Sequence, residues 1–362
     1  MTEQGHLKVY DLCLRTKSPL FIGNGKSYTK LEYLFDPDTF DVSVVDQHKL
    51  FQLLIDRDFV DQYEAFMLSR GSNKSLSRFL LNDLRLSRKD IARIVRYTIS
   101  GKYALDENHS LKELYSFHRD ESGKAYIPGS SLKGALRTVL LQQMILKDEK
   151  RSPNLQRGNI PEGRYLHTLR CKLDRESNTP KDDPVNSIMR GISISDSEYI
   201  PDSKFTISTK IDTGYHGGEN DINLCRECVV PGTEIHFRIT LDQSVLHESI
   251  TIDTLRNAIA EYGHYYRQTY VSSFERPLDD SGETYKNCIV LGGGAGFFSK
   301  TLVYPYLGKE KGFAYVTETL DRKFPARARA KEHDAGISPR KLKYTEYQKK
   351  LYPFGVCEVI FA

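Results

Sequence analysis

The 362-residue chain lacks several features that would place it in a membrane or in a secreted protein. It has no apolar run near the ~20 residues that a membrane-spanning helix needs. Its first ten residues are polar and then strand-like, without the apolar core of a signal peptide. The six cysteines are scattered, and a chain of this length needs no disulfide framework. We therefore expect reduced thiols, a cytoplasmic location and no contact with a membrane.

The chain also has little net charge. Its 52 lysines and arginines and 48 aspartates and glutamates leave a formal charge of +4, which gives no strong overall field for a polyanion. Any binding of nucleic acid must therefore come from local clusters of cations. The hydrophobic share of 39% and the charged share of 28% are typical of a globular protein, and the length predicts two domains.

Signatures of several enzyme classes are missing. The Walker spacing of two glycines before Lys-Ser/Thr does not occur. His118-Arg119-Asp120 resembles the catalytic loop of protein kinases, but the other kinase motifs are absent in the required order. The ten histidines show none of the close pairing that a metal-free ribonuclease often uses.

One stretch, residues 126–137, combines a turn with the start of a helix; it reads Tyr-Ile-Pro-Gly-Ser-Ser-Leu-Lys-Gly-Ala-Leu-Arg. The Pro-Gly pair, which ends at Gly129, is a turn signal. Ser130 or Ser131 can then cap a helix that runs on to Ile145. Backbone N–H groups at a helix start are unpaired and suit an anion.

Lys133 and Arg137 lie four residues apart on one face of this predicted helix. The helix dipole disfavours cations near an N-terminus, and a bound phosphate would offset that cost. The alternative is an ordinary capped helix with exposed cations. Both interpretations fit the residues.

Residues 126–137 and four further stretches, taken in order, resemble the RAMP superfamily of CRISPR proteins. The further stretches are Ser-Pro-Leu-Phe-Ile-Gly-Asn-Gly at 18–25, Ile-Ser-Asp-Ser at 194–197, Arg-Glu-Cys-Val-Val-Pro-Gly-Thr at 226–233 and Leu-Gly-Gly-Gly-Ala-Gly at 291–296. Together they cover most of the chain. The sequence is most similar to the subunit that caps the crRNA 3′ end in type III-A (Csm) effector complexes.

This resemblance implies an α+β fold. We expect an RRM-like (ferredoxin-like) RAMP core made of residues 1–45 and 126–241. Apolar residues spaced by three and four predict a helical insertion over 46–125. Prolines and mixed charges predict a flexible loop over 147–186. Residues 242–362 are expected to form a second, smaller RRM-like or α+β domain with a glycine-rich loop and a basic tail.

Local patterns add individual elements to this outline. Alternating or clustered apolar residues predict strands at 7–15, 32–35, 41–45, 288–291 and 356–361, and a helical pattern predicts an amphipathic helix over 253–274. Gly23-Asn24-Gly25 is typical of a hairpin turn. In RAMP proteins the corresponding loop faces the guide RNA, which implies the same for Gly23, Asn24 and Lys26.

The glycine-rich loop follows a predicted strand. It contains Gly292, Gly293, Gly294 and Gly296, and is followed by Phe297 and Lys300. Glycines let a backbone approach a ligand closely, and with a cation and an aromatic ring they favour a cradle for an RNA backbone. The spacing is not that of a Rossmann motif. The alternative is a glycine turn that packs on the first domain.

Two further features leave alternatives open. The basic tail holds Arg327 and Arg329 in a compact patch that could contact RNA or a protein partner. Cys225 and Cys228 form a lone Cys-x-x-Cys, whereas a zinc site usually needs four ligands; His216 and His236 flank the pair. Against the family pattern these cysteines look incidental, and we expect no metal and no cofactor.

The resemblance implies a non-catalytic crRNA-binding subunit that serves crRNA maturation and antiviral defence. Its candidate RNA contacts are Gly23, Asn24, Lys26, Gly129, Ser130, Ser131, Lys133, Arg137, Gly292, Gly293, Gly294, Gly296, Phe297, Lys300, Arg327 and Arg329. Its implied partners are the crRNA, the backbone RAMP subunit, and host ribonucleases that trim crRNA. The alternative is a metal-dependent endoribonuclease, for which Glu32 is the nearest carboxylate after the first glycine loop.

Overall fold

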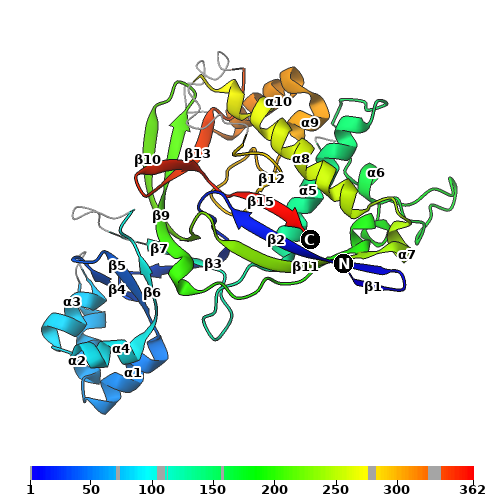
Figure 1. The fold of residues 1–362 in the computed structure, drawn as a ribbon. Coiled ribbons are helices and arrows are strands. Elements are labelled where there is room, and N and C mark those ends of the chain that lie inside the picture. Colours follow the sequence, from blue (N-terminus) through cyan, green and yellow to red (C-terminus); the bar gives the residue numbers. More distant parts are fainter. Residues whose placement is uncertain are drawn as a thin grey trace.

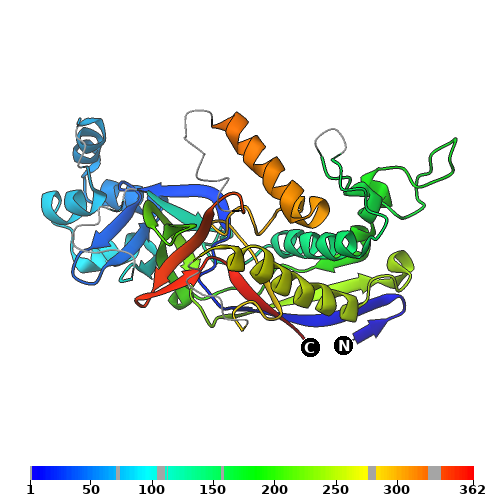
Figure 2. The ribbon, with the colours of Figure 1, turned by 90° about the horizontal axis from the view of Figure 1, so that it is seen from above.

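The computed structural model describes residues 2–70, 74–103, 111, 113–155, 159–275, 283–324 and 336–362. These residues form two β-sheets with helices packed beside them, and the two ends of the chain lie close together (Figures 1 and 2). The expected α+β class is confirmed. No helix in the described part of the chain has the length and apolarity that a membrane span requires.

The first sheet has the strand order β12-β15-β2-β11-β8, and β1 pairs with the free end of β2. Its strands are β1 (Thr2–Gln4), β2 (Leu7–Thr16), β8 (Ile192–Ile194), β11 (Glu234–Asp242), β12 (Cys288–Val290) and β15 (Val356–Phe361). All of the pairs are antiparallel. Alternation along β2 buries Leu12 and Leu14 and turns Asp11 away from the core.

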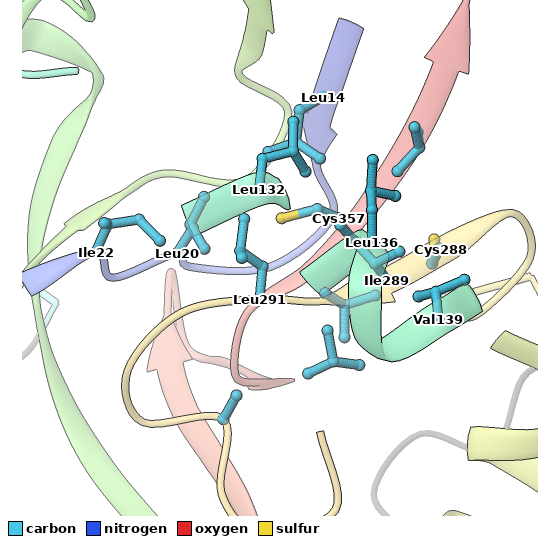
Figure 3. Packing of buried hydrophobic residues seen from close by; sticks show 14 of the residues in the cluster. Leu14, Leu20, Ile22, Leu132, Leu136, Val139, Cys288, Ile289, Leu291 and Cys357 are labelled. Atoms are coloured by element: carbon cyan, nitrogen blue, oxygen red, sulfur yellow. The ribbon is translucent and has the colours of Figure 1, made fainter. Parts of the chain in front are cut away.

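Helices α5 (Gly129–Lys147) and α8 (Ile252–Thr269) pack together and against this sheet. Leu132, Leu136 and Val139 of α5 lie against Leu14, Ile289 and Cys357 of three strands (Figure 3). In chain order β2-α5-β8-β11-α8-β15 is the ferredoxin-like βαββαβ arrangement, in which β15 is the last strand and pairs antiparallel with β2. Strand β12 is added at the edge of this sheet, beside β15. The expected RRM-like core is therefore present.

The second sheet has the order β3-β7-β10-β9-β6-β5-β4, and β13 pairs with both β9 and β14. Its strands are β3 (Gly23–Thr29), β4 (Tyr33–Asp36), β5 (Asp41–Val45), β6 (Val95–Ser100), β7 (Glu113–Phe117), β9 (Phe205–Gly214), β10 (Glu219–Val229), β13 (Lys341–Tyr347) and β14 (Lys350–Pro353). It extends from the first sheet toward the helical insertion (Figure 1).

The helical insertion is shorter than the expected range of 46–125. It contains α1 (Gln47–Asp56), α2 (Val60–Leu68), α3 (Leu76–Arg78), the π-helical turn η1 (Phe79–Asp83) and α4 (Arg88–Ile94) around a core of its own. After Ile94 the chain enters β6, where buried Tyr97 and Ile99 alternate with exposed residues. This period-two pattern ends the helical segment, and β6 and β7 belong to the second sheet.

The boundary expected at residue 241 does not separate two sheets. The second helix and last strand of the RRM-like core, α8 and β15, lie beyond it, and β15 pairs with β2. Strand β13 completes the second sheet by pairing with β9. Strand pairing over such sequence distances has no local signature, which is why the boundary was misplaced.

The remaining elements are α10, a helix of 15 residues, and several short helices and turns. They are α6 (Gly163–Leu166), α7 (Gln243–Leu246), α9 (Val303–Leu307), α10 (Lys309–Lys323) and the 3-10 turns η2 (Pro184–Asn186), η3 (Ile188–Gly191), η4 (Asp202–Lys204) and η5 (Val271–Ser273). Two of these elements lie in the stretch expected to be a loop. There, the buried Asn186 amide donates to the carbonyls of Lys172 and Lys181, at 2.6 and 2.9 Å.

A buried charge pair holds the centre of the second sheet. Glu227 on β10 is fully buried, and its carboxylate accepts bonds from the Tyr97 hydroxyl (2.7 Å) and the Phe117 backbone N–H (3.0 Å). The Arg119 guanidinium lies 3.5 Å from the same carboxylate, stacks on the Tyr97 ring at 3.6 Å and bonds Asp202 at 2.7 Å. This network connects three strands with the segment that follows β7.

We expect Arg119→Met to lower the free energy of unfolding by about 3 kcal/mol at neutral pH, because it leaves Glu227 buried without a counter-charge. Urea denaturation measures the difference. The matched control is Asp202→Asn, which removes only the more exposed partner of Arg119 and is expected to cost less than about 1 kcal/mol. Equal losses in the two variants would contradict the assignment.

The loss of stability in Arg119→Met should also depend on pH. Burial raises the pKa of Glu227, and the positive charge of Arg119 opposes this rise. An acid whose pKa is higher in the folded state lowers the free energy of unfolding as the pH rises from the unfolded-state pKa through the folded-state pKa. In Arg119→Met the opposing charge is gone, so the stability deficit should shrink on acidification toward the unfolded-state pKa. A deficit that does not change with pH would argue against a charged Glu227.

Candidate nucleic-acid interface

A cleft of about 600 Å³ lies where β3, the start of α5 and the loop after β12 meet. Three of the sequence motifs contribute to its wall. Of the predicted RNA contacts, it is lined by Gly23, Lys26, Ser130, Ser131, Gly292, Gly293 and Lys300. Residues nearly 300 positions apart in the sequence are thus brought to one site.

Close backbone packing forms the floor of the cleft. The Gly293 N–H donates to the Phe21 carbonyl at 2.8 Å. Gly292 has a φ of +89°, and a Cβ atom there would lie 2.2 Å from the Phe21 oxygen. A side chain at Gly292 is therefore excluded by both conformation and space. The glycine-rich loop therefore packs on the first motif, as the alternative interpretation predicts. It also lines the cleft, and its contact with RNA stays a prediction.

Gly23-Asn24-Gly25 is not the hairpin turn that its sequence predicts. The three residues begin β3, and the pairing of this strand with β7 is irregular between Gly23 and Ser27. Gly25 has a φ of +81°, and the Asn24 side chain accepts the Lys26 N–H at 2.9 Å. Asn24 therefore shapes the local backbone and does not line the cleft.

The start of α5 differs from the expected capping. Pro128 is the N-cap residue and makes no side-chain cap, so Ser130 and Ser131 lie in the first turn and line the cleft. The Gly129 N–H donates to the Asp196 carboxylate at 2.8 Å. This carboxylate comes from the Ile-Ser-Asp-Ser motif. One of the helix N–H groups that we expected to bind an external anion is therefore already bonded to a side chain of the protein.

The two helix cations also differ from the prediction. Arg137 forms an ion pair with Glu162, a partner that lies beyond the helix and could not be foreseen from local spacing. Lys133 is half-buried, does not line the cleft, and has a pKa lowered by its burial. Lys26 and Lys300 are instead the exposed cleft cations, and neither forms an ion pair with the residues that the structure describes.

The last two glycines of the glycine-rich loop pack against other side chains and do not line the cleft. Gly294 packs beside the Phe354 ring, and Gly296 lies against the stem of Lys343. Phe297 is 40% exposed but is not part of the cleft wall. Arg327 and Arg329 lie outside the described residues.

Several residues in and beside the cleft were missed, among them Tyr115, Gly134 and Arg226. Tyr115 and Gly134 line the cleft, and the Arg226 guanidinium stacks at 5.7 Å from the ring centres of both Phe21 and Tyr115. Arg226 and Tyr115 are register partners on β10 and β7. The sequence signal that could have identified Arg226 was its place in the recognised Arg226-Glu227 motif. Neighbouring residues on a strand point to opposite faces, so with Glu227 buried, Arg226 must lie on the other face of β10.

No metal-dependent catalytic centre is visible in the described part of the cleft. Its lining residues include no Asp, Glu or His. Glu32, the one carboxylate considered for cleavage, instead accepts bonds from the Thr29 N–H and hydroxyl, each at 3.0 Å.

The Cys-x-x-Cys pair is buried within the second sheet. Burial raises the pKa of Cys228 to about 12, which keeps this thiol protonated and disfavours metal binding. The flanking histidines point elsewhere, because His216 bonds Glu275 at 2.7 Å and His236 lies on the first sheet.

The model of the RAMP superfamily matches residues 13–319. The CRISPR system Cms protein Csm5 of Mycobacterium tuberculosis is 27% identical over 98% of this chain and 98% of its own length. The protein of the same name from Streptococcus thermophilus is 27% identical, over 82% of this chain and 80% of its own.

Two solved structures share the fold. A chain in the cryo-EM structure of a Csm–crRNA–target RNA ternary complex, from a type III-A CRISPR-Cas system, matches 98% of this chain and 100% of its own, with a TM-score of 0.69 and 16% identity. The crystal structure of T. onnurineus Csm5 matches 96% of this chain and 99% of its own, with a TM-score of 0.61 and 17% identity.

Two glycines of α5 provide a matched test of the site. A Cβ atom at Gly129 would lie 2.2 Å from the Ile194 carbonyl oxygen, whereas no atom of the residues that the structure describes lies within 4 Å of one at Gly134. We expect Gly129→Ala to lower the free energy of unfolding by about 1–3 kcal/mol. Gly134→Ala should raise it by about 1 kcal/mol, because alanine is the better helix former. Thermal denaturation of both variants measures this, and destabilisation by Gly134→Ala would contradict the described geometry.

Proposed function

The chain belongs to the RAMP superfamily, and from that premise we propose that it is a non-catalytic crRNA-binding subunit of a type III-A CRISPR effector complex. The observation that carries the proposal is the cleft, where three motifs distant in the sequence place two exposed lysines beside glycine backbone. This combination suits a sugar-phosphate backbone, because the cations hold phosphates and the glycines allow close approach.

Gly134 supports this proposal independently. It lies inside a helix, where glycine costs about 1 kcal/mol relative to alanine, yet no neighbouring atom of the described residues requires its small size. The open space beside it is the cleft itself. A ligand that approaches the helix backbone closely gives a physical reason for glycine at this position.

An aromatic residue of the cleft wall and the cation beside it complete the proposed contact surface. Tyr115 is a half-buried wall residue, and Arg226 stacks on it without a carboxylate partner among the described residues. A base can stack on the tyrosine ring, and the guanidinium adds a third positive charge near the phosphates. We therefore expect recognition of single-stranded RNA with little sequence preference.

The relatives supply the cellular setting of the proposal. Their names assign them to CRISPR systems, and one chain with this fold comes from a complex that contains crRNA. We extend this to an assignment at the crRNA 3′ end, with roles in crRNA maturation and antiviral defence. The proposed partners are the crRNA, the backbone RAMP subunit, and host ribonucleases that trim the crRNA.

We expect Lys26→Ala and Lys300→Ala each to weaken binding of single-stranded RNA without changing sequence preference. Each substitution should reduce the slope of log affinity against log salt by about 0.7, the value for one phosphate contact with a single strand. Fluorescence anisotropy at several salt concentrations measures the slope. The matched control is Lys49→Ala, an exposed lysine on α1, which should leave the slope unchanged. A change of the same size in the control would contradict the cleft assignment.

The alternative of a metal-dependent endoribonuclease is tested in the same preparation. Labelled RNA with a repeat-derived 3′ end is incubated with the chain, with and without divalent metal, and separated by gel electrophoresis. The proposal predicts shifted and intact RNA under both conditions. Shortened RNA that disappears on chelation would instead make the chain a nuclease, and loss of cleavage in Glu32→Ala would identify its carboxylate.

A further inference from the structure

The face of the first sheet that lies opposite α5 and α8 carries a cluster of unlike polar side chains. Along β2 and β11 the core residues alternate with outward-facing ones, among them Cys13 on β2 and Glu234 and His236 on β11. These two strands run side by side in the middle of the sheet (Figure 1). None of the three residues lines the cleft.

Strand register brings the three side chains together. Cys13 and His236 are direct cross-strand partners, and Glu234 precedes His236 by two positions and therefore faces the same side. The Cys13 Sγ, a Glu234 carboxylate oxygen and a His236 ring nitrogen all lie within 4.8 Å of one another. Of the described residues, these form the one such group of three potential metal ligands.

We propose that Cys13, Glu234 and His236 bind a single zinc ion, with water at the fourth position. A thiolate, an imidazole and a carboxylate are the donors that zinc uses, whereas Mg²⁺ and Ca²⁺ prefer sites made only of oxygen. Zinc holds such donors at about 2.0–2.3 Å in a tetrahedron. Small side-chain rotations would therefore bring the three ligand atoms from their present separations to one ion.

Arg15 positions the carboxylate for this role. Its Nε and Nη2 atoms donate to the Oε1 atom of Glu234, at 3.0 and 2.7 Å, and Nη1 contacts Glu358 at 3.2 Å. Both bonds to Glu234 end on Oε1, so the second carboxylate oxygen remains free to coordinate the ion. Metal-ligating carboxylates are commonly held by a neighbouring hydrogen-bond donor in this way.

The location indicates what the ion would do. All three ligands lie on the paired central strands of the first sheet, so a bound ion would cross-link β2 and β11 where they already pair. Since no ligand lines the cleft, ion binding would stabilise the sheet and leave the affinity for RNA unchanged. This inference is independent of the proposed RNA-binding function.

Cobalt(II) is a suitable spectroscopic probe of this site, because a coordinated thiolate gives a charge-transfer absorption band. We expect metal-free chain to bind one Co²⁺ with this band, and Zn²⁺ to displace it. Cys13→Ser should abolish the band, and His236→Asn and Glu234→Gln should each lower the zinc affinity about tenfold or more. Competition with a chromophoric zinc chelator measures that affinity, and Mg²⁺ should not compete.

Matched controls are Cys171→Ser and His264→Asn, which alter an exposed cysteine and an exposed histidine elsewhere in the chain. Both should keep the cobalt band and the zinc affinity of the unmodified chain. Near-UV circular dichroism confirms folding, and the exposed positions of Glu234 and His236 make these two variants informative even if Cys13→Ser is unstable. A chain that takes up no ion, a band that persists in Cys13→Ser, or a loss that follows Cys171→Ser would each overturn the proposal.

Discussion

The two sheets depend on one short crossover, residues 17–22, that carries the chain from β2 to β3. A buried crossover must find partners for every backbone N–H and C=O group. Leu20 exchanges two bonds with Val229 of β10, at 3.0 and 2.8 Å, and the Lys17 N–H donates to Val356 of β15 at 2.9 Å. The Pro19, Phe21 and Ile22 carbonyls accept from Gly355, Gly293 and His118. Elements from across the chain are thus fixed to one strand-like segment.

The cleft is a consequence of this crossover. Because the Phe21 carbonyl is bonded to the glycine-rich loop, that loop is held against the first residues of β3, and α5 supplies the facing wall. Lys26 and Lys300 then lie on two different segments whose separation is fixed by backbone hydrogen bonds. Preorganised cations of this kind lose less conformational freedom when they bind an anion.

Elements with a clear period could be predicted from the sequence. The strands at 41–45 and 356–361 were predicted with the bounds that the structure gives them, and helix α8 was predicted with its C-terminal end too far along the chain. Strand β6 was missed because its sequence pattern is weak. It follows four helices, and its alternation of buried and exposed residues is only six residues long. Strand order is set by long-range pairing, so the position of β15 beside β2, and of β12 beside β15, could not be predicted from local patterns.

The types of residue that line the cleft could be predicted from the sequence, but the residues with which they form hydrogen bonds and ion pairs could not. Gly23, Gly292, Gly293 and the two lysines of the cleft were predicted because motif and chemistry agreed. The ion pair of Arg137 was not foreseen, because Glu162, its partner, comes from a separate segment. Asp196 was known as part of a motif, but its bond to the Gly129 N–H depends on how β8 packs beside α5. The juxtaposition of Cys13 and His236 likewise follows from strand register, which spacing along the chain does not encode.

The pairing of β15 with β2 sets the order in which the protein can fold. Arg15 on β2 and Glu358 on β15 form an ion pair although they lie 343 positions apart in the sequence. During synthesis β2 leaves the ribosome long before β15, and its edge from Leu12 to Thr16 stays unpaired until β15 has followed. Such non-local pairing slows folding and exposes a strand edge meanwhile. The nascent protein should therefore depend on chaperones, or on early association with its partners, to keep that edge from pairing with another chain.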